Sequence, residues 1–166
     1  MILNHPVSPG PGLVPGLAHL FTLSAGVGSS DDTGEGTLGR RIRDSVGEGT
    51  FLGERLRGEL LPGSADWRLM RRDITSVVDA RVMLRTDDGA LIYMSYGGRI
   101  VVPPDVLAQA RDPERRHLLD PATYYFRTAP VFETGAEAYR WLNNIVCIGT
   151  GRLTAKGVDY EIFEVL

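Results

Sequence analysis

Four side chains with acid–base or anion-stabilising chemistry stand beside an aromatic residue or a tight turn. They are the two carboxylates Asp66 and Glu133 and the two guanidinium groups Arg85 and Arg127. A carboxylate whose pKa is raised by burial can move a proton near neutral pH. An arginine can stabilise a developing enolate or carboxylate. These four residues are therefore the candidate catalytic set for proton transfer on a small organic molecule.

Aromatic and polar residues near this set are candidates for binding the substrate, because small-molecule pockets are usually lined by aromatic side chains and a few convergent polar groups. The substrate-binding candidates are Trp67, Arg81, Tyr93, Tyr125, Trp141 and Asn143. Structural roles stay open, since both tryptophans could pack in a core and Glu133 could cap a following helix. We expect at least two of the four catalytic candidates to face one cavity that Trp67, Tyr93 or Trp141 also lines.

Motifs for metal, nucleotide or nucleophilic chemistry are absent from the sequence. No His, Cys, Asp or Glu cluster has zinc-site spacing, and there is no G-x-S-x-G elbow or P-loop. Gly34 to Gly39 matches G-x-G-x-x-G by letter, but a dinucleotide fingerprint needs a strand before it and a helix after it. The sequence predicts no metal and no cofactor, and Cys147, in an apolar run, is predicted to be a buried, inert thiol.

Composition places the chain among soluble, single-domain proteins. It has 166 residues, of which 43% are hydrophobic and 23% charged, with a net charge of -3. The negative charge argues against nucleic acid, and no apolar run approaches the roughly eighteen residues of a membrane span. With a single cysteine and no secretory signal, the expected setting is the cytoplasm. The expected partner is a small-molecule ligand or substrate, and a homo-oligomer stays open.

The segment from Ser76 to Tyr96 is predicted to be a β-hairpin around Asp88-Gly89, with a positive φ at both turn residues. Side chains alternate along a strand, so one face of its first arm is apolar. The opposite face is mixed and carries Val77, Asp79, Arg81, Met83 and Arg85. It is either a solvated face with weak ion pairs, which composition favours, or a polar wall inside a ligand-holding barrel.

Twenty Gly and ten Pro are spread over the whole chain and cut it into short segments, a pattern typical of many strands and turns. Residues 1–14 are predicted to be a flexible Pro/Gly-rich arm and 15–166 a single domain. Further strands are expected at 17–27, 40–46, 49–60, 123–128, 145–152 and 158–165. A loop is expected at 29–36, a turn at 132–135, and short helices at 105–119, broken near Pro113, and at 136–144. The predicted fold class is all-β, an antiparallel β-barrel of lipocalin-like type, with a sandwich as the alternative.

The chain also resembles a known family, DUF3237, also called UPF0311. The matching motifs, in order, are Pro15–Leu17, Leu20–Leu23, Gly49–Phe51, Arg57–Trp67, Leu84–Gly89, Tyr125–Pro130, Phe132–Gly135 and Tyr139–Asn143. Two departures are Ser64, where the family often has Gly, and Ala80-Arg81-Val82, which lacks an aromatic after the Arg. The resemblance implies a β-barrel and, by analogy with relatives in natural-product pathways, a role on polyketide- or terpenoid-like compounds.

Three functions are compatible with these observations. The first is a cofactor-independent enzyme that isomerises, cyclises or dehydrates a small, partly apolar molecule inside the barrel. The second is a binding protein without turnover, and the third is a structural or assembly partner. A pocket with a carboxylate near both an Arg and a Tyr would favour the enzyme. A purely apolar lumen would favour binding, and a lumen filled by side chains would favour assembly.

Overall fold

The computed structural model describes residues 14–166, which fold into one antiparallel sheet. Its strands are β1 (Leu17–Glu35), β2 (Arg40–Leu52), β3 (Arg57–Leu60), β4 (Ser64–Asp66), β5 (Leu69–Met70), β6 (Ser76–Thr86), β7 (Leu91–Val101), β8 (Tyr125–Glu133), β9 (Cys147–Leu153) and β10 (Gly157–Val165). The helices are α1 (Pro104–Arg111) and the short 3₁₀ helices η1 (Arg116–Leu118), η2 (Pro121–Thr123) and η3 (Glu137–Asn144). The all-β prediction is confirmed, whereas all of the predicted arm except Val14 lies outside the described residues.

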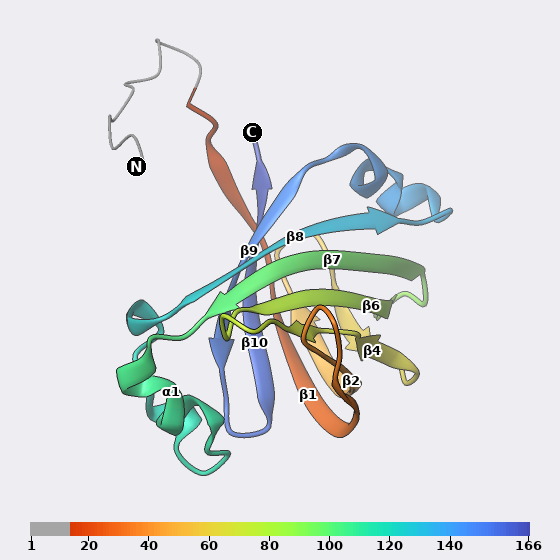
Figure 1. Cartoon of the computed structure of the whole chain (residues 1–166). Coiled ribbons are helices and arrows are strands. Elements are labelled where there is room, and N and C mark those ends of the chain that lie inside the picture. The colour runs from red at the N-terminus through yellow and green to blue at the C-terminus, as the bar shows by residue number, and fades with distance from the viewer. Residues whose placement is uncertain (1–13) are drawn as a thin grey trace.

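The sheet closes on itself into a barrel (Figure 1). Strand β1 pairs with β10 on one side and with β2 on the other. The short strands β3, β4 and β5 follow one another in a single position, each pairing with β2 and with β6. Closure matters because it satisfies the edge strands and turns one face of every strand toward a common interior.

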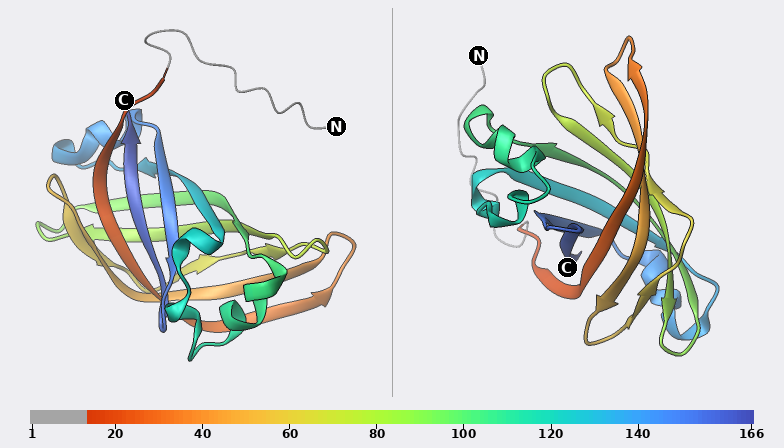
Figure 2. Two further views of the ribbon diagram at one scale, coloured as in Figure 1. Left: turned by 90° about the vertical axis from the view of Figure 1, so that its left-hand side faces the viewer. Right: turned by 90° about the horizontal axis from the view of Figure 1, so that it is seen from below.

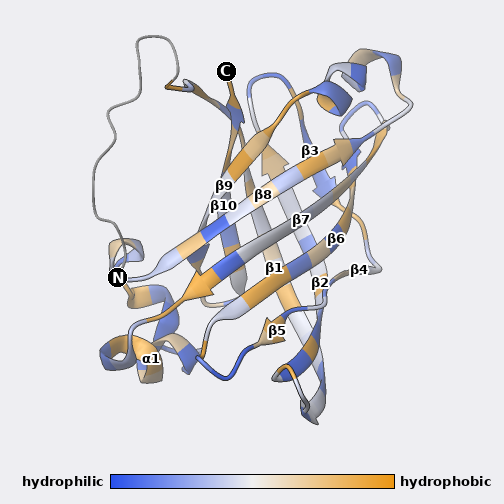
Figure 3. Cartoon of the chain, turned by 45° about the horizontal axis from the view of Figure 1, so that its top comes forward, coloured by the Kyte–Doolittle hydropathy of each residue, from blue (hydrophilic) through white to orange (hydrophobic). Residues whose placement is uncertain are grey.

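One end of the barrel is filled by side chains. Phe21 packs against Phe51 and Phe132, with ring centroids 5.6 and 5.9 Å apart, and Leu142 of η3 is fully buried. Apolar and polar residues alternate along the strands in Figure 3, as expected when one face meets a core and the other meets water. Because the interior is packed at this end, the large cavity of the barrel lies toward the other end.

The opposite end of the barrel is covered by α1 and η1, which lie beside the β9–β10 turn (Figure 2). Arg116 connects the two segments: its Nε donates to the Thr154 carbonyl at 2.7 Å and its Nη2 to the Ala155 carbonyl at 3.0 Å. The predicted break near Pro113 separates α1 from η1. We call α1, η1 and the residues between them the cap. No helix in residues 14–166 is long and apolar enough to cross a membrane.

The predicted loop at residues 29–36 is a strand in the structure. The prediction is wrong because β1 continues to Glu35 and pairs with β2. Asp31 and Arg43 form an exposed cross-strand ion pair in this hairpin, and β2 buries Ile42 and Val46 on its other face. The G-x-G-x-x-G letters fall at its turn, where the Gly36 N–H donates to the Gly39 carbonyl at 2.9 Å.

The expected turn at 132–135 is also partly wrong, because β8 runs through Pro130 to Glu133. Strand β8 pairs with β9 only at Arg127 and Thr128, so Pro130 lies where β8 has a neighbour on one side alone. A proline fits such an edge because its missing N–H removes no ladder hydrogen bond. The expected strand 49–60 is instead divided between β2 and β3, where the Gly53 N–H donates to the Leu56 carbonyl at 3.0 Å.

The β6–β7 hairpin has the predicted position but a different turn. Gly89 has a φ of 88°, whereas Asp88 does not have the positive φ that a two-residue turn would need. Hydrogen bonds from Thr86 N–H to the Ala90 carbonyl (2.9 Å) and from Gly89 N–H to the Thr86 carbonyl (2.8 Å) define a three-residue loop with its glycine in the left-handed region.

Replacing Gly89 with valine is expected to lower the free energy of unfolding by about 1–3 kcal/mol, because a branched side chain is strained at this φ. Chemical denaturation would measure the change. Gly135→Val is the matched control, since both glycines are exposed with open space around the added Cβ, but Gly135 lacks a positive φ. Equal effects of the two substitutions would contradict the turn assignment.

Candidate functional site

A cavity of about 740 Å³ occupies the half of the barrel beneath the cap. Its apolar wall includes Val46, Ile100, Val102, Leu107, Phe126 and Leu153, and its polar groups include Asp44, Asp66, Arg68, Ser76, Tyr96 and Tyr160. Apolar walls with a few convergent polar groups are the usual character of a small-molecule site. The lumen is thus neither purely apolar nor filled by side chains.

Asp66 is the only sequence-predicted catalytic residue that lines this cavity. It ends β4, between Asp44 of β2 and Ala80 of β6, and its Oδ1 accepts a 2.9 Å hydrogen bond from the Asp79 N–H. Burial raises the pKa of the Asp66 carboxyl to about 6, and the nearby Asp44 charge adds to the rise. The Asp79 hydrogen bond and Arg68 oppose it. Asp66 is therefore able to gain and lose a proton near neutral pH.

The second carboxylate of the cavity, Asp44, is neutralised by an ion pair. Asp44 is 6% exposed and pairs with the Nε of Arg68, while the Ser30 hydroxyl donates to its other oxygen. A buried charge is tolerated only when it is paired and hydrogen-bonded. Within the described part of the chain Asp66 has no salt bridge of its own. The two neighbouring carboxylates therefore have different roles, one structural and one available for proton transfer.

Two phenol groups face the same space as Asp66. The rings of Tyr96 and Tyr160 meet edge to face with centroids 5.5 Å apart, and both residues are buried. Burial raises the pKa of both hydroxyls, and the charge of Asp66 raises them further. Both tyrosines thus remain protonated at neutral pH and can donate a hydrogen bond.

Ser76 adds an unpaired hydroxyl to the cavity wall. The residue is 6% exposed, and its Oγ has no hydrogen-bond partner among residues 14–166. Buried hydroxyl groups are nearly always hydrogen-bonded. The residue borders the cavity, but its Oγ itself has almost no accessible surface.

The other candidate carboxylate, Glu133, lies at a separate and shallow depression. Tyr93, Thr134, Gly135 and Asn143 line this depression with it. Asn143 is used structurally, since its side-chain amide exchanges hydrogen bonds of 2.8 and 2.9 Å with the backbone of Thr134. Glu133 does not cap η3 either, because η3 begins after Ala136 without a side-chain cap.

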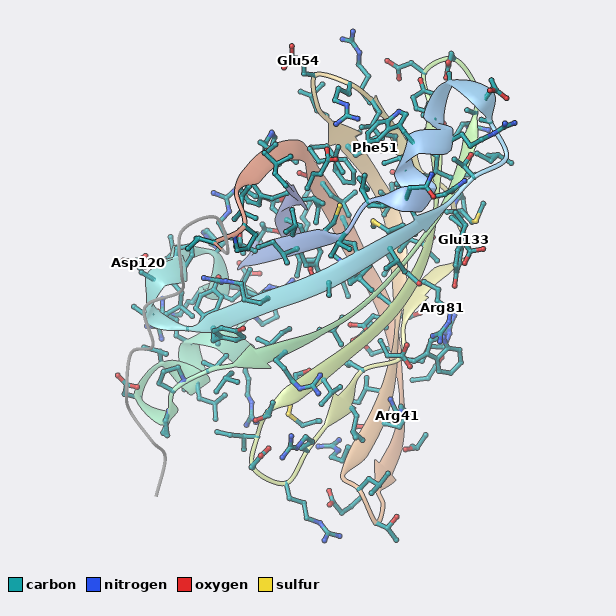
Figure 4. The ribbon with its side chains drawn as sticks, turned by 90° about the horizontal axis from the view of Figure 1, so that it is seen from above. Arg41, Phe51, Glu54, Arg81, Asp120 and Glu133 are labelled. Atoms are coloured by element: carbon teal, nitrogen blue, oxygen red, sulfur yellow. The ribbon has the colours of Figure 1, made fainter. Side chains whose placement is uncertain are left out.

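The mixed face of β6 is the outer wall of the barrel. Arg81 pairs with Asp79 at 2.8 Å, and Arg85 pairs with Glu59 of β3, all four side chains being about half exposed. Figure 4 shows Arg81 and Glu133 projecting away from the barrel. The solvated-face interpretation is therefore confirmed, and the polar wall inside the barrel is wrong.

The remaining candidates also lie outside the cavity, and most of them stack with arginines. The guanidinium carbons of Arg43, Arg55 and Arg127 lie 5.9, 3.5 and 5.2 Å from the ring centroids of Trp67, Trp141 and Tyr125, respectively. Trp141 also packs against the core, the structural role left open for it. We expected at least two of the four catalytic candidates to share a cavity. This is wrong for the two pockets described, because the large cavity contains only Asp66 of the four and the shallow depression only Glu133. Strand parity explains part of this, since Asp66 and Trp67 are adjacent and point to opposite faces.

The sequence analysis missed Asp44, Arg68, Ser76, Tyr96 and Tyr160. A signal for Tyr96 was available, because the core-face alternation of Ile92 and Met94 continues to it and excludes Tyr93. No such signal links Arg68 to Asp44. Cys147 is buried, and burial raises the pKa of its thiol to about 11, as expected for an inert thiol. Residues 14–166 contain no group of three or more His, Cys, Asp or Glu placed to hold a metal ion.

The raised pKa of Asp66 predicts a pH-dependent effect on stability. Its folded-state pKa of about 6 exceeds the ordinary value of 3.8, so its contribution is fully present below about pH 4 and is lost as the pH rises through about 6. We expect Asp66→Asn to exceed the wild type in unfolding free energy by about 1–2 kcal/mol near pH 8 but not near pH 4. Urea denaturation at both pH values measures this difference.

Glu59→Gln is the control for this prediction, because Glu59 is a half-exposed carboxylate on the outer wall. It should change the unfolding free energy by less than about 0.5 kcal/mol at either pH. A wild type as stable as Asp66→Asn near pH 8 would contradict the burial of an ionised carboxylate at this site.

Comparison with known proteins agrees with the barrel. The family model described as "Protein of unknown function (DUF3237)" matches residues 15–165. A UPF0311 protein of Rhodopseudomonas palustris is 35% identical over 149 residues, covering 89% of this chain and 95% of that protein. The crystal structure of a conserved protein of unknown function from the same species superimposes with a TM-score of 0.84, covering 92% of this chain and 99% of that one.

Two further structures share the fold. A β-barrel-like protein from Acinetobacter baumannii has a TM-score of 0.80 at 31% identity, covering 96% of this chain and 99% of that one. An enzyme from Penicillium herquei has a TM-score of 0.70 at 21% identity, covering 96% of this chain and 98% of that one, which shows the fold alone. The family match over nearly the whole described chain, together with these relatives, shows that the protein belongs to the DUF3237 (UPF0311) family.

Proposed function

We propose that this protein is a cofactor-independent enzyme that transfers a proton on a small, partly apolar organic molecule held in the barrel cavity. The reaction class is isomerisation, cyclisation or dehydration. The observation that carries the proposal is the Asp66 carboxyl, which lines a cavity of about 740 Å³ with a pKa raised to about 6. A carboxylate near both an Arg and a Tyr is also the arrangement that favours an enzyme over a passive carrier, and Asp66 lies near Arg68 and Tyr96.

In the proposed reaction, Asp66 removes a proton next to a carbonyl or from a hydroxyl of the substrate. Negative charge then develops on a substrate oxygen, and the phenol of Tyr96 or Tyr160 donates a hydrogen bond to it. Preorganised donors in a water-poor site stabilise such charge more strongly than water does. Asp66 afterwards returns the proton to another atom or to a leaving hydroxyl. These groups replace Arg85 and Arg127, which the sequence had suggested for the anion-stabilising role.

The walls of the cavity would supply substrate orientation. Phe126 packs edge to face against Tyr160 with ring centroids 5.3 Å apart, which fixes the plane of the phenol. Holding reacting groups in one geometry contributes to rate by removing the entropy cost of alignment. The same type of barrel occurs in the Penicillium herquei protein described as an enzyme, so the fold is compatible with catalysis.

A non-catalytic binding protein is the second candidate, favoured by the large apolar share of the cavity wall. The test is a screen of aromatic and polyketide-like acids, ketones and alcohols, read in two ways. Thermal stabilisation reports binding, because a ligand that binds only the folded state raises its stability. Chromatography with mass spectrometry reports isomeric or dehydrated products. Stabilisation without product in every case would leave the binding protein and reject the enzyme.

A further inference from the structure

Three basic side chains around the cavity lack the carboxylate partners that most arginines of this protein have. Arginines elsewhere, such as Arg40, Arg57 and Arg152, form salt bridges. Within the described residues, Arg111 and Lys156 have no side-chain hydrogen bond or ion pair, and Arg116 bonds only to backbone carbonyls. All three line the cavity.

These three residues mark the solvent side of the cavity. Arg111 ends α1, Arg116 begins η1, and Lys156 lies in the β9–β10 turn to which Arg116 ties the cap. Arg111 and Lys156 are exposed, whereas Asp66, Tyr96 and Tyr160 are largely or wholly buried. A molecule that enters beneath the cap therefore meets basic groups at the mouth and the proton-transfer group deeper inside.

The charge of the cavity lining is opposite to that of the whole chain. The chain carries a net charge of -3, but the cavity is lined by four cations and two carboxylates: Arg68, Arg111, Arg116, Lys156, Asp44 and Asp66. The Asp44–Arg68 pair cancels internally. What remains is a basic mouth that attracts anions, because a cavity lined by one sign of charge concentrates ligands of the other sign.

The ligand must also be long enough to reach from the mouth to Asp66. Tyr96 and Ile100, both on the cavity wall, are four residues apart on β7, a distance of roughly 13 Å between their Cα atoms. Ser76, which pairs with Ile100 across the sheet, borders the same stretch of the cavity.

From these observations we propose that the cavity binds an elongated organic acid. Its carboxylate lies at the mouth against Arg111 and Lys156, with Arg116 adding charge. Its apolar body lies along Ile100 and Phe126, and its reacting carbonyl or hydroxyl lies beside Asp66. The inference rests on the proposed function in taking the same cavity as the ligand site, and it adds the class of compound.

The test compares two probes of equal length, ω-hydroxydecanoate and its neutral amide, ω-hydroxydecanamide, by isothermal titration calorimetry with the full chain. The acid is expected to bind roughly tenfold more tightly at low ionic strength, because only the carboxylate gains charge-assisted hydrogen bonds. The preference should shrink at high salt, since exposed charges are screened.

The double variant Arg111→Gln and Lys156→Gln is expected to lose the preference for the acid while it binds the amide as the wild type does. Arg99→Gln is the matched control, because Arg99 is an exposed arginine on β7 that does not line the cavity and, in the described part of the chain, bonds only to a backbone carbonyl. It should keep the full preference. Both proteins keep the Asp44–Arg68 pair and the barrel core.

Equal affinity for acid and amide in the wild type, or a preference that survives in the double variant, would overturn the organic-acid inference. Neither result would contradict the proposed function, which is tested by turnover and by the effect of replacing Asp66. Conversely, a clear acid preference in a protein that shows no turnover on any acid would keep this inference and leave the cavity as a binding site. Failure of both probes to bind also overturns the inference.

Discussion

Asp66→Asn is expected to lower kcat/KM on a true substrate by about a hundredfold or more, because general acid–base groups typically contribute 10² to 10⁴ to the rate. Asparagine matches the size of aspartate and keeps an oxygen that can accept the hydrogen bond from the Asp79 N–H. The fold should therefore persist, and the variant is expected to be more stable than the wild type at neutral pH. Loss of activity together with a gain in stability separates catalysis from misfolding.

The pH dependence of kcat/KM provides a second readout of the same group. Asp66 acts as a base only when ionised, so kcat/KM should rise with pH and reach a plateau above about 6, the pKa of this carboxyl. The rise should be absent from the residual activity of Asp66→Asn. Glu133→Gln is the control, because Glu133 lies at a different depression and should keep the wild-type profile. Full activity of Asp66→Asn, or loss of activity only in Glu133→Gln, would reject the assignment.

Arg68→Met is expected to have the largest effect on stability, a loss of about 3 kcal/mol, since removing one partner of a buried pair leaves an uncompensated charge. Asp44 is 6% exposed, and within residues 14–166 the Ser30 hydroxyl is its only side-chain partner besides Arg68. Methionine keeps most of the length of the arginine side chain without its charge. Arg68 also lowers the pKa of Asp66, so the plateau of the activity profile should move to higher pH in this variant.

Arg81→Met is the matched control for this substitution. Arg81, on β6, also pairs with an aspartate, but both partners are about half exposed. Exposed pairs contribute about 0 to 1 kcal/mol, so urea denaturation should show a much smaller loss. Similar losses for Arg68→Met and Arg81→Met would contradict the burial of the Asp44–Arg68 pair.

The sequence by itself determined the strands whose side-chain alternation or turn chemistry is local. The β6–β7 and β9–β10 hairpins are where alternation and Gly-containing turns predict them, and the all-β class follows from their number. Alternation also predicts the core face of β6, from Val78 to Leu84. Asp66 was a candidate because it is a carboxylate directly beside an aromatic residue, Trp67, which is also local information.

Tertiary structure alone decided which polar residues share the interior. Asp44, Asp66, Tyr96 and Tyr160 come from four strands, and they meet because the sheet closes and its strands are in a particular register. A shift of one residue in register would turn each of them outward. In the sequence, Arg85, Arg127 and Glu133 are candidates as good as Asp66. In the structure their side chains do not line the cavity, because of the strand face on which they lie and their position along the strand. The type of a residue is local information, whereas the side of a closed sheet that it faces depends on pairing between segments far apart in the chain.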